Sequence, residues 1–177
     1  KKASHAIYVT ERFLQKRYPT NGKTTNVSNV EVQIPPPKYV SKKISLLSQD
    51  KEQVKIGLMG SMNVRYKGHL ELLKAINEVK SQLPDFEIEF IGPGNTSWLE
   101  DLASDLGLKE SLIFRGKLPS GKPVLEWLDT LDIYVHPSVT EGLPRSVIEA
   151  MSRACPVLAS SVGGIPELLD DKYMHTP

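Results

Sequence analysis

Cysteine is almost absent from this sequence, and no one sign of charge dominates it. The single cysteine, Cys155, excludes an internal disulfide and argues against a structural zinc site, so we expect a small buried side chain in a reducing compartment. With 22 Lys and Arg against 21 Asp and Glu, the net charge is +1, which removes the electrostatic argument for nucleic acid binding. Long hydrophobic runs are also lacking, so no membrane-spanning helix is predicted.

The pattern of apolar residues predicts alternating strands and helices from residue 54 onward. Compact apolar runs that end near glycine, such as VKIGLM at 54–59, are typical of buried parallel strands. Strands are expected at 54–59, 87–92, 111–116, 132–137 and 156–160, and helices at 69–83, 96–107, 123–131, 144–154 and from 165 onward. Strands separated by helices of this length predict βαβ units, hence an α/β fold with a doubly wound parallel sheet.

The first 53 residues have a different character. The segment 3–19 predicts a strand and a short helix, whereas 21–52 is polar, Pro-rich and weakly periodic, as in a linker or a long surface excursion. We therefore divide the chain into 1–53, the end of a preceding lobe with a linker, and 54–177, one Rossmann-like domain. Because the sequence stops just after an expected helix start, we interpret it as a piece of a larger protein.

Ligands of a doubly wound sheet bind beyond the carboxyl ends of its strands, where free backbone N–H groups favour anions. Five successive loops at this edge are short and rich in small residues, which lets the backbone approach a ligand closely. Each loop alone is ordinary turn chemistry. The loops are 60–68, 92–95, 115–121, 136–144 and 160–167.

Two glutamates near this edge are informative through their spacing. Glu149 follows Glu141 by eight positions, which corresponds to about 12 Å along a helix axis. That distance is too long for the carboxylate pair of a glycosidase or for one shared metal ion. It suits a ligand with hydroxyls at both ends and an anion between them, such as a nucleoside diphosphate sugar. Glu141 alone could also serve only to stabilise the helix dipole.

The segment EGLPRSVIEAM, followed by PVLASSVGGIPELL, resembles the Glu-x7-Glu signature region of the retaining GT-B glycosyltransferases of group 1, relatives of glycogen synthase and sucrose synthase. The likeness extends in order through nearly all of 54–171, and an ordered set is far more specific than any single motif. The resemblance implies that 54–177 is the C-terminal, nucleotide-sugar-binding lobe of a GT-B fold, and that 1–53 holds the end of the N-terminal lobe and the crossover.

The resemblance also implies roles for individual residues. Glu141 would contact the hydroxyls of the donor sugar, and Lys67 would neutralise the diphosphate without a metal ion or other cofactor, so these two are the candidate catalytic residues. Glu149 would accept hydrogen bonds from the ribose. The other candidate donor-binding residues are Gly60, Ser61 and Arg65 in the phosphate loop, Gly92 and Pro93, Gly116, Lys117 and Leu118 beside the base, and Gly142, Leu143 and Pro144 at the turn facing sugar and diphosphate.

Two positions depart from the family pattern. Ser61 stands where many relatives have arginine, and Arg65 could supply the missing charge. Ala154 stands where the helix usually ends in glycine, and a left-handed alanine costs about 1 kcal/mol. His136 is expected to be a packing or capping residue, with a place beside the sugar as the alternative, and His69 is expected to cap a helix. Glu167 either stabilises a helix N-terminus or lies near the donor.

Taken together, the resemblance implies a retaining, metal-independent transferase that moves a hexose-type sugar from a UDP- or GDP-sugar to a glycan, lipid-linked or polysaccharide acceptor. We expect the enzyme in the cytoplasm, and a peripheral association with the inner face of the membrane is compatible with such acceptors. This chain alone should bind donor without appreciable transfer. The alternatives are a sugar epimerase of the same architecture and a noncatalytic nucleotide-binding lobe. A dinucleotide-dependent oxidoreductase is disfavoured because no G-x-G-x-x-G opens the first crossover.

Overall fold

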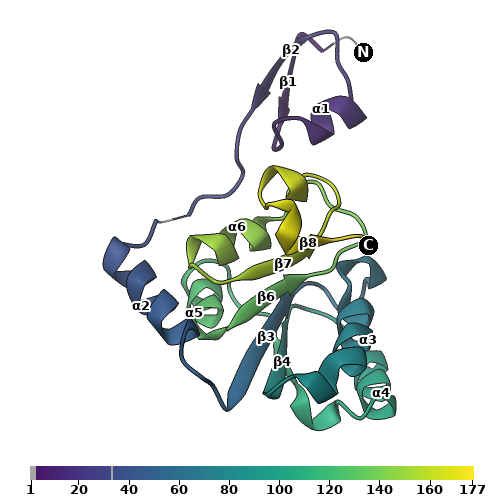
Figure 1. The fold of residues 1–177 in the computed structure, drawn as a ribbon. Coiled ribbons are helices and arrows are strands. Elements are labelled where there is room, and N and C mark those ends of the chain that lie inside the picture. Colours follow the sequence, from purple (N-terminus) through teal and green to yellow (C-terminus); the bar gives the residue numbers. More distant parts are fainter. Residues whose placement is uncertain (1–2, 33) are drawn as a thin grey trace.

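The computed structural model describes residues 3–32 and 34–177 (Figure 1). A small parallel pair of strands, β1 (His5–Tyr8) and β2 (Lys23–Asn26), flanks the short helix α1 (Phe13–Arg17), and α2 (Pro37–Leu47) leads into the main sheet. The strands of the main sheet are β3 (Gln53–Met59), β4 (Asp85–Ile91), β5 (Leu112–Gly116), β6 (Ile133–His136), β7 (Val157–Ser160) and β8 (Met174–His175). Its helices are α3 (His69–Val79), α4 (Ser97–Asp105), α5 (Lys122–Thr130) and α6 (Arg145–Ser152).

The strand order explains where a ligand site belongs. Within the described residues, the six-stranded sheet has the order β5-β4-β3-β6-β7-β8, and every neighbouring pair is parallel. The chain first moves outward from β3 to β5 and then returns to β6 on the other side of β3. Such a reversal is the topological switch point of a Rossmann-like fold, and a crevice opens there beyond the strand ends. The predicted fold class is confirmed.

Alternation along the strands produces two cores. Ile56 and Leu58 of β3 and Phe90 of β4 point toward α3 and α4, whereas Ile91 and Tyr134 belong to the core beneath α5 and α6. Figure 1 shows these helix pairs on opposite faces of the sheet. Both cores pack against the strands, so the loops at the carboxyl edge start from fixed positions.

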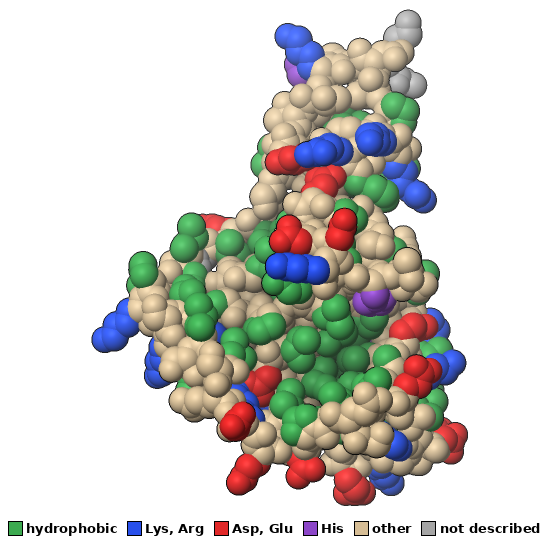
Figure 2. Space-filling model, in the orientation of Figure 1, with side chains coloured by type: hydrophobic (Ala, Val, Ile, Leu, Met, Phe, Trp, Pro, Cys, Tyr) green, Lys and Arg blue, Asp and Glu red, His purple; other side chains and the backbone are tan. Residues whose placement is uncertain are grey.

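The sheet face beside α3 is incompletely covered toward β7. An apolar groove of about 760 Å³ lies there, and Figure 2 shows hydrophobic side chains gathered on this face. Its apolar lining includes Ile56, Leu72, Ile76, Val135 and Leu158. No helix of the described residues is both long and apolar enough to span a bilayer.

Two expectations about the local structure were wrong. A helix, α2, occupies part of the segment expected to be a linker, where buried Lys43 donates hydrogen bonds to the carbonyls of Asp129 (2.7 Å) and Leu131 (2.8 Å). A lysine on the packed face hides the apolar periodicity of this helix. At the other end, 165–171 forms no α-helix but a 3-10 turn, Ile165–Glu167, and the chain then enters a second 3-10 turn and β8.

The end of α6 agrees with its sequence. Ala154 has a φ of 49°, the left-handed conformation expected where relatives carry glycine. Cys155 follows and is buried, as predicted. Pro144 was expected in the first turn of this helix. It instead takes the N-cap position, with φ −72° and ψ 117°, so α6 begins one residue later than expected, at Arg145.

Candidate functional site

A cleft of about 780 Å³ lies at the switch point, beyond the carboxyl ends of β3, β4, β5 and β6. Eleven of the fourteen predicted site residues line it, namely Gly60, Ser61, Lys67, Gly92, Pro93, Lys117, Leu118, Glu141, Leu143, Pro144 and Glu149. Arg145, Ser146, Asn29 and the Pro119–Ser120 segment also contribute to the lining. Four of the five predicted loops therefore converge on one cavity, while the loop 160–167 stays outside it.

An ion pair joins the two candidate catalytic residues across the switch point. The Lys67 Nζ lies 2.7 Å from the Glu141 Oε1, and the two residues are 74 positions apart in the sequence. Gly68 allows this approach, because it has a φ of 84° and a Cβ there would lie 2.1 Å from the carbonyl oxygen of Pro137. The loop after β3 thus packs directly on the loop after β6.

A histidine holds the same carboxylate from beneath. His136, at the end of β6 and 1% exposed, places its Nε2 2.9 Å from the Glu141 Oε1, and its Nδ1 lies 3.2 Å from the hydroxyl of Tyr134. Burial alone would raise the pKa of Glu141, but the contacts with His136 and Lys67 outweigh it and lower that pKa to about 2. Glu141 is therefore an ionised acceptor, fixed through Oε1, and no hydrogen bond from the described residues reaches its Oε2.

Glu149 has a different environment from Glu141. It lies half-buried on α6 within the cleft, and burial raises its pKa, with Arg145 acting in the opposite direction. A carboxylate that is partly desolvated without a close cation gains most from hydrogen-bond donors brought by a ligand. The two glutamates thus present distinct chemistry to the same cavity.

The two glycine-containing loops after β3 and β4 are joined by backbone contacts. Gly60 N–H donates to the carbonyl of Ile91 (2.9 Å), and Met62 N–H donates to that of Pro93 (2.8 Å). Gly92 has a φ of 145°, and a Cβ there would lie 1.9 Å from the carbonyl oxygen of Gly60. Only glycine permits this contact, so the wall of the cleft is backbone, available to a ligand at close range.

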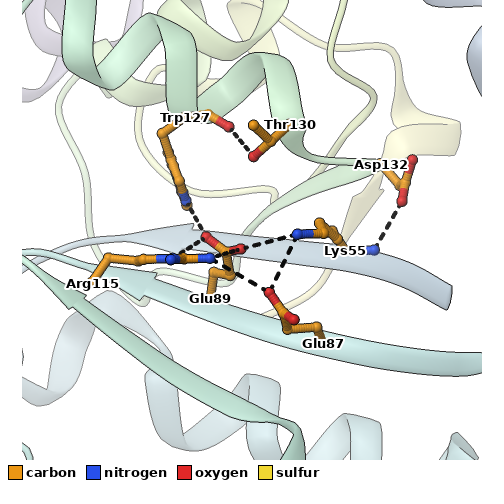
Figure 3. Close-up of polar contacts among 7 residues, drawn as sticks. All are labelled: Lys55, Glu87, Glu89, Arg115, Trp127, Thr130 and Asp132. Carbon is orange, nitrogen blue, oxygen red and sulfur yellow. Dashed lines mark hydrogen bonds and ion pairs between the residues drawn. The ribbon is translucent and has the colours of Figure 1, made fainter.

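An ionic network around buried Glu89 supports the end of the cleft that Lys117 and Leu118 line (Figure 3). The carboxylate of Glu89, 1% exposed, accepts hydrogen bonds from Nε (2.9 Å) and Nη2 (2.8 Å) of Arg115 and from Trp127 Nε1 (2.7 Å). These contacts lower the pKa of Glu89 despite its burial, which acts to raise it. They tie the end of β5 to β4 and α5, directly before Lys117 and Leu118. Sequence reasoning missed this network, although the alternating acids in EIEFIG were a usable signal.

Three predicted residues do not line the cleft. Arg65 is exposed and lies outside it, where its guanidinium carbon sits 3.5 Å from the centre of the Trp98 ring. Gly116 and Gly142 occupy the flanking turns but are not among the lining residues. Arg145 lies in the cleft instead, a cation that sequence reasoning overlooked although it directly follows Pro144.

His69 is not a capping residue, contrary to expectation. It begins α3 fully buried, makes no side-chain cap contact, and neither ring nitrogen has a hydrogen-bond partner among the described residues. Its ring packs edge-on against Phe90 with 4.9 Å between the ring centres. Burial, with Lys67 and His136 nearby, lowers the pKa of His69 to about 4. A sequence does not show whether a histidine such as His69 will be buried without hydrogen-bond partners.

Metal-binding residues are not clustered in the part of the chain that the structure describes, where no group of three or more His, Cys, Asp or Glu side chains could hold an ion. Independence from metal ions stays a prediction.

Comparison with known sequences decides the family. The sequence pattern described as "Glycosyl transferases group 1" matches residues 53–176. The chain belongs to this family. Protein CapJ of Staphylococcus aureus is 34% identical over 181 residues, which cover 100% of this chain and 44% of CapJ. Sulfoquinovosyl transferase SQD2 of Arabidopsis thaliana is 37% identical over 102 residues, covering 58% of this chain and 19% of SQD2. The chain thus spans less than half the length of these two relatives.

Solved structures agree on the fold of this group 1 member. Anabaena Alr3699/HepE, in complex with UDP and glucose, superposes with a TM-score of 0.77 at 21% identity, over 99% of this chain and 50% of HepE. WaaG, a glycosyltransferase involved in lipopolysaccharide biosynthesis, gives 0.70 at 19% identity, over 91% of this chain and 45% of WaaG. At these identities the likeness shows the fold, which is of the predicted GT-B type.

Proposed function

We propose that this chain is the donor-binding lobe of a retaining glycosyltransferase, and that the cleft at the switch point holds a nucleoside diphosphate sugar. The observation that carries the proposal is the convergence of one lysine and two unlike carboxylates in a single cavity. Glu141 would hold the sugar, Lys67 the diphosphate and Glu149 the ribose. This assignment rests on the joint placement of Lys67, Glu141 and Glu149 and on membership of the group 1 family.

The chemistry follows from the charges. When the sugar leaves the nucleotide, negative charge develops on the departing diphosphate, and cations or helix N-termini already aimed at that position stabilise it. Lys67 would supply one cation, and Arg145 with the start of α6 would supply the charge that the distant Arg65 does not. With a pKa of about 2, Glu141 is suited to accept hydrogen bonds from sugar hydroxyls and not to donate a proton.

The relatives suggest what the donor and acceptor would be. HepE binds UDP and glucose, so a UDP-hexose is the donor to test first, with GDP as the second nucleotide. TuaC of Bacillus subtilis carries the description of a putative teichuronic acid biosynthesis glycosyltransferase, and AmsK of Erwinia amylovora that of an amylovoran biosynthesis glycosyltransferase. By analogy, a cytoplasmic enzyme that extends a glycan or a lipid-linked polysaccharide precursor is proposed for the whole protein.

Calorimetric titration of this chain with UDP, GDP and ADP tests the proposal. Saturable heat with one of the three, and tighter binding of the matching nucleotide sugar, is the expected result. If none of the three nucleotides binds to protein that circular dichroism shows to be folded, a donor site in this cleft is excluded.

A further inference from the structure

One carboxylate joins the two ends of the chain. Glu167, half-buried in the 3-10 turn after β7, accepts backbone hydrogen bonds from Glu11 (2.6 Å), Arg12 (3.0 Å) and Phe13 (2.8 Å). Burial would raise the pKa of Glu167, but these three N–H groups outweigh it and lower that pKa. The carboxylate thereby satisfies the free amides at the start of α1, which otherwise have no intrahelical partner.

The contact with the N-terminal segment extends beyond these hydrogen bonds. Thr10 is 1% exposed, and its Oγ1 accepts a hydrogen bond from Leu14 N–H (2.8 Å). Its methyl group packs on Gly164, where a Cβ would lie 2.7 Å from the Thr10 Cγ2. Residues 10–14 therefore dock on the loop 161–167 through backbone, side-chain and steric contacts.

The opposite side of the same loop supports the Glu141 turn. Gly164 N–H donates to the carbonyl of Gly142 over 2.6 Å. Gly163 has a φ of 63°, and a Cβ there would lie 2.2 Å from the carbonyl oxygen of Glu141. The backbone that carries Glu141 thus packs against Gly163 and Gly164. Gly164 in turn contacts Thr10, and its carbonyl accepts a hydrogen bond from Glu167 N–H.

We propose that Glu167 is a positioning residue: it latches residues 10–14 onto the loop 161–167, and this latch fixes the Glu141 turn at the sugar end of the cleft. The inference rests on the proposed function, because it assigns the loop outside the cleft to the grip on the donor sugar. The proposed base and ribose contacts do not involve the latch, since Lys117 follows β5 and Glu149 lies within α6. Loss of the latch should impair sugar recognition and spare nucleotide recognition.

The test compares Glu167→Gln with Glu126→Gln, a control on the exposed face of α5 where, among the described residues, the carboxylate pairs with Lys122 alone. Glutamine keeps the size of the side chain but has one acceptor oxygen where the carboxylate has two, so it cannot accept all three N–H groups in the same geometry. Hydrogen exchange at residues 11–13 should accelerate at least about tenfold in Glu167→Gln. Affinity for UDP should stay within about twofold, while the additional affinity of UDP-glucose over UDP should fall about tenfold, a loss equal to one good hydrogen bond.

Each outcome decides the inference. Faster exchange at 11–13 with an unchanged difference between UDP-glucose and UDP would overturn it, because the contact would then serve stability alone. An equal loss of UDP and UDP-glucose affinity would also overturn it. If Glu167→Gln fails to fold, Thr10→Ser removes only the methyl contact with Gly164 and should shift the same difference in the same direction. Failure of the unchanged chain to bind UDP is a separate result that removes the proposed function itself.

Discussion

Lys67 and Glu141 form a 2.7 Å ion pair across the topological switch point of the sheet. The proposed partner of the diphosphate is thus paired with the proposed partner of the sugar. A donor would exchange this pair for two new contacts, because its diphosphate attracts Lys67 while its hydroxyls approach the Glu141 Oε2. His136 would keep its contact with Oε1, so Glu141 would retain one of its two partners.

Removal of the Lys67 charge should weaken diphosphate binding selectively. Lys67→Gln is expected to lower the affinity for UDP at least about tenfold and to leave uridine binding unchanged, since only UDP carries the anion. Arg65→Gln is the matched control, because Arg65 stacks on Trp98 outside the cleft. Calorimetry with UDP and uridine measures both. An Arg65→Gln variant as impaired as Lys67→Gln would show that the phosphate loop rearranges around the ligand.

His136 should matter through the N–H that it donates to Glu141. His136→Leu removes this contact, so the difference in affinity between UDP-glucose and UDP should shrink about tenfold. His136→Gln can still donate to the carboxylate and should retain most of that difference. Titration of both variants with the two ligands distinguishes a positioning role from simple packing. A packing role predicts that leucine retains more of the difference in affinity than glutamine does.

The buried charge of Glu89 should contribute to stability. Glu89→Gln leaves Arg115 without its bidentate partner and is expected to lower the free energy of unfolding by about 2 kcal/mol. The exposed control Glu126→Gln should change it by no more than about 0.5 kcal/mol. Urea unfolding gives both values. If both variants unfold with the same free energy, the contacts of Glu89 only offset the cost of burying its charge and add no net stability.

His69 should make stability depend on pH in the mildly acidic range. Its pKa is about 4 in the folded protein against an ordinary value of 6.5, so between these values the unfolded chain binds a proton that the folded chain does not. The free energy of unfolding is therefore unaffected by protonation of His69 above pH 6.5, and it falls by roughly 3 kcal/mol in total as the pH drops from 6.5 toward 4. His69→Leu should flatten this part of the pH profile of urea unfolding. The control His5→Leu, at an exposed position, should leave the profile unchanged.

The sequence was sufficient for β3 to β7, but not β8, and for most of the residues that line the cleft, because both depend on local patterns. Buried parallel strands are continuous apolar runs, and a loop that follows such a strand must lie at the carboxyl edge. The pattern of strands and loops therefore assigns Lys67 and Glu141 to the same edge of the sheet. Their direct contact could not be predicted in this way, because it depends on the steric fit of Gly68 against Pro137.

Several expectations that were wrong or missing depend on partners distant in the sequence. Lys43 in α2 is stabilised by carbonyls almost ninety residues away, and the partners of Glu89 come from β5 and α5. A pattern-based prediction treats such charged residues as solvent-exposed, which is the usual outcome. Arg65 was expected in the cleft, but its side chain stacks on the ring of Trp98 outside it.

The most direct test of the proposed donor cleft is whether Glu149 recognises the ribose. Calorimetry should compare UDP with 2′-deoxy-UDP in the unchanged chain and in Glu149→Gln. We expect the unchanged chain to prefer UDP about tenfold, as a charge-assisted hydrogen bond would cause, and Glu149→Gln to lose most of this preference. A Glu149→Gln variant that binds UDP as tightly and as selectively as the unchanged chain would contradict the assignment of this cleft to the nucleotide.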